Sequence, residues 1–283
     1  MLRTLGVIVV MMACCAAATV VPVRVQSWAV ETGPAAKSRT GLATPTEFAD
    51  LVKSDPLEAL AASIEVYDRR ITHLRAKFCK QERIGGKLLP AEVIRVAFRD
   101  DPFAVSMVWQ KGGGTASATL YVRGEHDGQM LAKLPLVGAK RIDPRGVMPR
   151  LSARYTIEEF GLVQASRRTL KAWTASRNRG ELKTEYLGLQ PVAELDGRLC
   201  HVIRRHCPND EIDAFAPGDP TEVNDKNRAD AFRSVTIYFD AETLLHTGTV
   251  LTRSDGELAG AYWFREFEAN PKLPPNQFTP AGW

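Results

Sequence analysis

Residues 93–109 read VIRVAFRDDPFAVSMVW, two runs of alternating apolar and other side chains that flank a short polar turn. Side chains of a β-strand point alternately to its two faces, so each run predicts a strand with one buried face. The Asp-Asp-Pro turn at residues 100–102 favours joining the two strands as an antiparallel hairpin. The apolar positions of this hairpin are Ile94, Val96, Phe98, Phe103, Val105, Met107 and Trp109.

The same period of two continues on both sides of the hairpin. It begins after about residue 74, where Leu74, Ala76 and Phe78 alternate with other residues until Gly85 and Gly86 interrupt the strand. Such runs, joined mostly by short turns, predict about nine or ten antiparallel strands. The further predicted strands cover residues 119–123, 129–133, 182–190, 198–206, 233–240, 246–253 and 258–268.

Two segments have the period of an amphipathic helix instead. The first opens with Asp55 as the predicted N-cap and Pro56 at the first helical position. The second opens with Thr156 and Glu159 at the spacing of a capping box. The apolar stripes are Leu57, Leu60, Ile64, Tyr67, Ile71 and Leu74 in the first helix, and Phe160, Val163, Leu170 and Trp173 in the second.

The order of these elements predicts the fold class. A doubly wound parallel sheet is excluded, because it requires regular alternation of strands and helices. We expect an α+β fold: a strongly curved antiparallel sheet, an unclosed half-barrel, with helices packed on its concave face. Such a sheet would enclose an apolar space, filled either by side chains or by a bound molecule. The candidate cavity residues are Ile64, Tyr67, Phe78, Ile94, Val96, Phe98, Phe103, Val105, Met107, Trp109, Phe160, Val163, Leu170 and Trp173.

The N-terminus has the pattern of an export signal, with Arg3 before an apolar run and small residues after it. We therefore predict a signal peptide at 1–29, a flexible linker at 30–45 and a single domain at 46–283. The N-terminal pattern predicts an exported protein, with the periplasm as the expected compartment. The alternatives are a retained N-terminal anchor and lipid attachment at Cys14.

The composition is that of a soluble globular protein, with 45% hydrophobic and 25% charged residues. The formal net charge is +4, and it falls to +2 if residues 1–29 are removed, because Arg3 and Arg24 leave with them. A nearly neutral domain has no global signature of nucleic-acid binding, so no nucleic-acid partner is predicted.

Three cysteines would remain after processing, so one internal disulfide at most can form. Residues 200–207 hold Cys200, His201, His206 and Cys207, but an extended strand spreads them over about 20 Å and two faces. No metal site is therefore predicted, and Cys200 is too far from Cys207 to pair with it. A bridge from Cys79 to Cys200 or Cys207 and a set of buried free thiols remain the two alternatives.

The second predicted helix is unusually basic and contains no acidic residue between 160 and 180. It is either a solvated helix face or a patch for an anionic partner. The patch residues are Arg167, Arg168, Lys171, Arg177 and Arg179. The polar stretch from Pro208 to Asp230 predicts a long loop, whose length indicates either a functional flap or disorder.

The strand region resembles a known family. The motifs are FCKQERIGGKLLP at 78–90, VIRV at 93–96, DPF at 101–103, VW at 108–109, LCHVI at 199–203, VTIYFD at 235–240 and YWF at 262–264, with Asn270 and Phe278. They are similar to the domain-of-unknown-function family 1571. The motifs between Phe78 and Trp109 more distantly resemble the periplasmic outer-membrane lipoprotein carrier superfamily. That resemblance implies an unclosed antiparallel barrel with a helical lid, in proteins that carry acylated proteins, bind lipids or sense envelope stress.

The chain contains no Gly-x-Ser-x-Gly elbow, no phosphate-binding Gly-Lys-Ser/Thr motif and no His-Glu-x-x-His zinc motif. We therefore expect a protein without catalytic residues or cofactor, soluble or peripheral to the envelope, that binds a lipid, an acyl chain or a lipoprotein. The first alternative is an envelope interaction or stress-sensor module with a filled core. The second is a hydrolase, which a cleft with two ionisable residues of perturbed pKa would favour.

Overall fold

The computed structural model describes residues 41–114, 116–212, 223–225 and 227–283. The predicted signal peptide, most of the predicted linker and the middle of the predicted 208–230 loop lie outside these residues. No helix in the described ranges combines the length and the apolar character that crossing a membrane requires.

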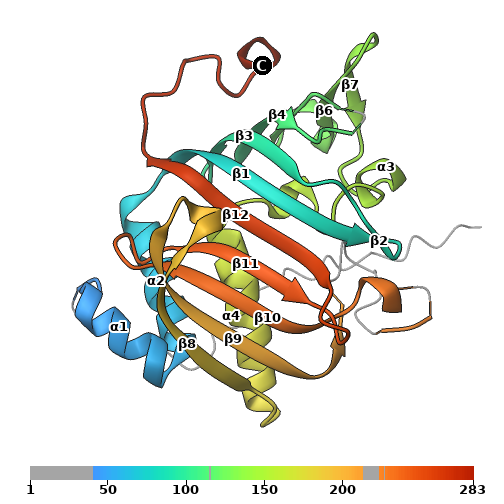
Figure 1. The fold of residues 1–283 in the computed structure, drawn as a ribbon. Helices are drawn as coiled ribbons and strands as arrows, with labels where there is room; N and C mark the ends of the chain where they lie inside the picture. The colour runs from blue at the N-terminus through green and yellow to red at the C-terminus, as the bar shows by residue number, and fades with distance from the viewer. Residues whose placement is uncertain (1–40, 115, 213–222, 226) are drawn as a thin grey trace, which may run out of the picture. The chain divides into compact units, whose positions relative to one another are not determined.

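One antiparallel sheet dominates the fold (Figure 1). In the described residues its strands follow the order β7-β6-β5-β4-β3-β1-β12-β11-β10-β9-β8, and β2 pairs with the end of β1. The edge strands β7 and β8 do not pair with each other, so the sheet is unclosed, as predicted. The strands are β1 (His73–Ile84), β2 (Lys87–Leu88), β3 (Glu92–Arg99), β4 (Ala104–Lys111), β5 (Ala118–Val122), β6 (Met130–Leu134), β7 (Gly138–Ile142), β8 (Lys183–Val192), β9 (Arg198–Glu211), β10 (Phe232–Asp240), β11 (His246–Thr252) and β12 (Leu258–Ala269).

The hairpin at 93–109 forms as predicted, with Phe98 opposite Val105 and Val96 opposite Met107. The edge strand β7 was not predicted. The first four residues of its sequence, Gly-Ala-Lys-Arg-Ile, are exposed. A strand without a buried face needs no alternation of apolar residues, so this sequence gave no strand signal. The predicted loop at 208–230 also begins too early, since β9 continues to Glu211.

The helices are α1 (Pro45–Ser54), α2 (Pro56–Arg70), α3 (Val147–Arg150) and α4 (Leu162–Asn178). The 3₁₀ turns are η1 (His126–Gly128), η2 (Ile157–Glu159), η3 (Ala193–Leu195), η4 (Arg228–Asp230) and η5 (Pro280–Gly282). Asp55 caps α2 as predicted, because its side chain accepts hydrogen bonds from the backbone N–H groups of Leu57 and Glu58. The short helices α1 and α3 were not predicted.

The predicted start of the second helix is wrong. Thr156 and Glu159 form no side-chain capping box; they belong to turn η2, and α4 begins later, at Leu162. The residue before α4 is Gly161, with φ 137° and ψ 147°, a backbone conformation that is essentially restricted to glycine. A Cβ atom there would lie 2.9 Å from the ring of Phe98. The helix therefore starts where glycine allows the chain to turn and to approach β3 closely.

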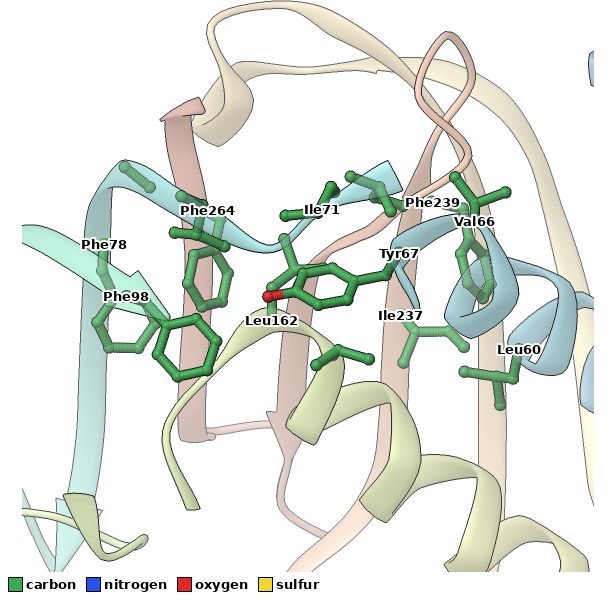
Figure 2. Close-up of a cluster of buried hydrophobic side chains, with 14 of the residues drawn as sticks. Leu60, Val66, Tyr67, Ile71, Phe78, Phe98, Leu162, Ile237, Phe239 and Phe264 are labelled. Atoms are coloured by element: carbon green, nitrogen blue, oxygen red, sulfur yellow. The ribbon is translucent and has the colours of Figure 1, made fainter. Parts of the chain in front are cut away.

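Helices α2 and α4 contact each other and cover the concave face of the sheet (Figure 1). Figure 2 shows the resulting core, in which the ring of Tyr67 projects from α2 to a position near Leu162 of α4. Aromatic rings of the sheet surround it, with Phe98 and Phe264 on one side and Phe239 on the other. Leu57, Leu60 and Tyr67 of the first predicted stripe thus pack in the core with the strands, as their period indicates. The end of that stripe is wrong: α2 ends at Arg70, and Leu74 belongs to β1.

His246 links the two helices to the sheet. Its backbone N–H donates to Ser63 Oγ of α2 at 3.1 Å, and its Nδ1 lies 3.2 Å from Ser166 Oγ of α4. Its Nε2 lies 2.8 Å from Thr249 Oγ1 in the same strand. Burial, with a smaller contribution from the nearby charge of Arg168, lowers the pKa of His246 to about 4. The ring is therefore neutral in the folded protein near neutral pH.

We predict that Gly161→Ala destabilises the fold by about 2 kcal/mol, because alanine is strained at this φ and its methyl group meets Phe98. Urea unfolding measures this loss. Gly114→Ala is the matched control, because Gly114 has no positive φ and, its chain neighbours aside, no atom lies within 4 Å of where the new methyl group would be. Equal midpoints for the two variants would contradict the close contact between α4 and β3.

We predict that stability falls as the pH drops from about 6.5 towards 4. The unfolded chain protonates His246 near pH 6.5, whereas the folded chain keeps it neutral down to about pH 4. His246→Gln should remove up to about 3 kcal/mol of this pH dependence, since one pKa unit corresponds to about 1.4 kcal/mol. Urea midpoints measured between about pH 4 and 6.5 give the pH dependence of stability for wild type and for His246→Gln. His201, whose pKa is also lowered by burial, contributes equally to both proteins. Parallel curves would contradict the prediction.

Candidate functional site

A pocket of about 360 Å³ lies between the sheet and the chain segment that covers it. Strands β1, β3, β4, β5 and β6 form one side, β10, β11 and β12 continue the wall, and residues 148–173 provide the cover. Most of the exposed pocket surface is apolar. Among the apolar and aromatic lining residues are Phe78, Ile94, Met107, Trp109, Met130, Phe160, Trp173, Val235, Leu251, Tyr262 and Phe264.

The structure separates the predicted cavity residues into three groups. Six line the pocket, six are buried in the core without lining it, and two are half-buried beside the core. Alternation shows which face of a strand is buried, but not which part of that face the covering chain leaves open. The lining group is Phe78, Ile94, Met107, Trp109, Phe160 and Trp173; the core group is Tyr67, Val96, Phe98, Phe103, Val105 and Val163; the half-buried pair is Ile64 and Leu170.

The pocket also has a charged end that was not predicted. The inward face of β1 is apolar at Leu74, Ala76 and Phe78, and the same alternation then brings Lys80 and Glu82 to this face. The strand register aligns Lys80 with Glu92 of β3 and with Tyr262 of β12. Continuing the period of two by four residues beyond Phe78 would have revealed this change from apolar to charged side chains. We call Lys80, Glu82, Glu92, Trp109 and Tyr262 the Lys80 cluster.

Hydrogen bonds connect the members of the Lys80 cluster. Lys80 Nζ donates to Glu82 Oε2 at 2.7 Å and lies 3.7 Å from Glu92 Oε2. Trp109 Nε1 donates to Glu92 Oε2 at 2.7 Å, and the Tyr262 hydroxyl donates to Glu82 Oε1 at 2.8 Å. These bonds connect charged side chains of β1 and β3 with aromatic side chains of β4 and β12, in one row across the pocket wall.

The Lys80 cluster also holds the covering segment. Lys80 Nζ donates to the carbonyl oxygen of Ser152 at 3.1 Å, and the backbone N–H of Arg154 donates to Glu82 Oε1 at 3.3 Å. The guanidinium of Arg154 donates to the carbonyl oxygens of Arg83 and Asp230. The chain between α3 and η2 is thus fixed above one end of the pocket.

Burial and charge act in opposite directions on Lys80. Burial works to lower the pKa of its ammonium group, but Glu82 and Glu92 outweigh burial and raise it. Burial raises the pKa of Glu92, and Lys80 and the hydrogen bond from Trp109 only partly oppose that rise. Lys80 is therefore charged near neutral pH, and Glu92 binds a proton more readily than an exposed glutamate.

Of the two alternatives for the cysteines, the structure has the free thiols: Cys79, Cys200 and Cys207 form no disulfide. Cys79 lies on β1 and the other two on β9, four strand positions away, which is about 19 Å along the sheet. Burial raises the pKa of the Cys200 and Cys207 thiols to about 12, so both stay protonated. In the described part of the chain, no three His, Cys, Asp or Glu side chains gather in a way that could hold a metal ion.

The predicted basic patch lies on α4 and just beyond its end, but acidic residues neutralise much of it. Arg167 is 2.7 Å from Asp68 and 3.4 Å from Asp100, and Arg179 is 2.7 Å from Glu181. The other members have separate surroundings. Arg177 is 3.6 Å from Asp55, Arg168 lies over the ring of Tyr155 and donates to the carbonyl of Glu159, and Lys171 is exposed. The partners of Arg167 and Arg177 come from other segments, so the sequence of the helix alone could not show them.

A comparison with curated protein sequences gives no match. Among solved structures, MucB matches with a TM-score of 0.45 and 14% identity, over 81% of this chain and 62% of MucB. MucB is also seen in a MucA/MucB complex from Pseudomonas aeruginosa, with a TM-score of 0.44 and 13% identity over 80% of this chain and 61% of that one. The chain thus spans less than two thirds of MucB.

The lipoprotein LppX of Mycobacterium tuberculosis matches with a TM-score of 0.43 and 15% identity, over 78% of this chain and 99% of LppX. A further match is a LolA superfamily protein from Nitrosomonas europaea, with a TM-score of 0.30 and 10% identity. It covers 78% of this chain and 96% of that protein. These similarities are too distant to carry an argument about activity or ligand.

The sequence pattern of one family matches a continuous part of the chain. It covers residues 71–217, which is just over half of the 283 residues. This range includes the motifs at 78–109 that resemble family 1571. The chain therefore belongs to the family described as Protein of unknown function (DUF1571).

Proposed function

We propose that this protein binds a lipid, or the acyl chain of a lipidated protein, in the pocket between the sheet and residues 148–173, without catalysing a reaction. The observation that supports this most directly is the pocket itself, with its mainly apolar surface of aromatic and aliphatic side chains. Its volume of about 360 Å³ lies at the lower end of the range of about 300–1,000 Å³ found for small-molecule sites. This size favours one acyl chain over a lipid with several chains.

The alternatives have less support. A completely filled core does not account for the pocket. The basic patch is weakened as a partner site by the ion pairs of Arg167, Arg177 and Arg179 within the chain. The pocket does contain ionisable residues with perturbed pKa, among them Lys80, Glu92, Glu159 and His246, a feature that favours a hydrolase. However, Lys80 is held in its charged form and bonded to Glu82 and Ser152, so it offers neither a free base nor a nucleophile.

The proposed location follows from the sequence of residues 1–29, which has the pattern of an export signal. Residues 46–283 would then form a single exported domain, in a compartment where lipids and acylated proteins are available as ligands. A protein with this role is soluble or peripheral to the envelope and needs no cofactor.

We predict that the protein, purified under native conditions from the envelope of its own organism, carries a bound acyl compound. Ala165→Phe should reduce this load by at least about tenfold, because Ala165 lines the pocket from α4 and a phenyl ring would occupy the space. Native mass spectrometry measures the fraction of protein with a bound ligand.

Ala175→Phe is the matched control, since Ala175 is an exposed residue of the same helix that does not line the pocket. Both variants lose the same helix propensity, so their effects differ only through the pocket. Urea midpoints close to wild type show that both are folded. Ligand-free wild-type protein without affinity for acyl probes, or equal loading of the two variants, would count against the proposal.

A further inference from the structure

The Lys80 cluster uses most of its hydrogen-bond donors within the protein. The Lys80 ammonium group is directed at Glu82, Ser152 and Glu92, and Trp109 donates its only N–H to Glu92. The hydroxyl proton of Tyr262 goes to Glu82. A molecule that reaches this end of the pocket therefore meets a lysine whose remaining N–H faces Glu92 at 3.7 Å, while the N–H of Trp109 and the hydroxyl proton of Tyr262 are already donated.

Acceptor capacity remains at the same end. Both contacts of Glu92 are made by Oε2, and no hydrogen bond from the described residues reaches its Oε1, although Glu92 lines the pocket. The cluster also contains two carboxylates and one ammonium group, so it carries an excess of negative charge when Glu92 is ionised. An anionic group would be repelled here, and a donor would complete the hydrogen bonding of Glu92.

Two further polar groups of the pocket wall lack partners. Thr119 Oγ1 and Glu159 Oε2 are buried and make no hydrogen bond, and both residues line the pocket. Thr119 is only 5% exposed. It lies on β5, next to the strand that carries Trp109, and η2 with Glu159 lies over β5, since the Tyr121 hydroxyl is 3.3 Å from Glu158. Buried polar groups favour having partners, so these atoms offer hydrogen bonds to a molecule in the pocket: Glu159 as an acceptor, and Thr119 as an acceptor or a donor.

From these contacts we infer that the ligand is an amphiphile whose polar end donates hydrogen bonds and is not anionic, such as an ammonium, hydroxyl or amide group, and that this end binds at Glu92. This inference rests on the proposed function and specifies its ligand class. The guanidinium of Arg205, whose Nε also lacks a partner, does not create an anion site at this end. It lies on β9, five strand positions from β3, and both of its terminal nitrogens are bound by Glu211.

The test compares three probes with the same chain and different ends: dodecylammonium, dodecanol and dodecanoate. Their affinities for delipidated full-length protein are measured by calorimetry at neutral pH, below the critical micelle concentrations of the two ionic probes and below the solubility limit of dodecanol. We expect dodecylammonium and dodecanol to bind at least about tenfold more tightly than dodecanoate. A tenfold difference in affinity is about what one hydrogen bond to a charged group contributes. Glu92→Gln should lower the ratio of dodecylammonium to dodecanoate affinity by about tenfold, because the amide removes the charge but keeps an acceptor for Trp109.

Glu268→Gln is the control, because Glu268 is an exposed residue of β12 that pairs with Arg75 outside the pocket. It should leave all three affinities unchanged. If Glu92→Gln does not fold, Thr119→Val serves instead: it keeps the side-chain shape, removes the unpartnered hydroxyl, and should weaken dodecanol binding relative to dodecanoate.

Equal or tighter binding of dodecanoate, or an affinity ratio that Glu92→Gln leaves unchanged, would overturn the inferred ligand class. In that case, tight dodecanol binding would still support an acyl-binding pocket. Failure of all three probes to bind would instead reject the proposed function, and the inference with it.

Discussion

Most of this structure depends on one constraint: the sheet is much wider than the helices that cover its concave face. In the part of the chain that the structure describes, eleven strands follow one another across the sheet. At about 4.8 Å per strand, they make a surface about 48 Å wide along its curve. Helix α4, with 17 residues, is about 26 Å long. With α2 it buries the part of the concave face around Tyr67. In the described residues, the remaining part is covered by α3, η2, the chain between them and one side of α4. Segments with so few apolar side chains cannot fill the space beneath them, so a pocket remains.

The two parts of the cover are attached by different interactions. Helix α4 is attached by apolar packing, by the close approach of Gly161 to Phe98, and by the contact between Ser166 and His246. The segment before η2 is attached by the Lys80 cluster, through Ser152 and the backbone of Arg154. Charged groups buried at this point keep their hydrogen bonds only if the segment stays in place, which favours one position of the cover over looser ones.

Sequence periodicity predicted the parts of the fold in which one face of an element is buried. The strands at 93–109 and the helix capped by Asp55 follow directly from side-chain spacing and local capping. Periodicity failed at β7, where the side chains are exposed, and at the start of α4, where the close contact between Gly161 and Phe98 decided the boundary instead of Thr156. Six of the candidate cavity residues line the pocket, whereas Val96 and Phe98, on the same strand face as Ile94, lie in the core.

The sequence by itself determined the antiparallel strands, the α+β class and the family, because alternation, turns and motifs are local properties of the chain. Only the tertiary structure decided which inward-facing residues border open space, that the three thiols are far apart, and that Arg167 and Arg177 of α4 have acidic partners. It also placed Lys80 between Glu92 and Glu82 under the covering segment. These features depend on distances between residues that are remote in sequence, and such distances are set by how the sheet curves and by what lies over it.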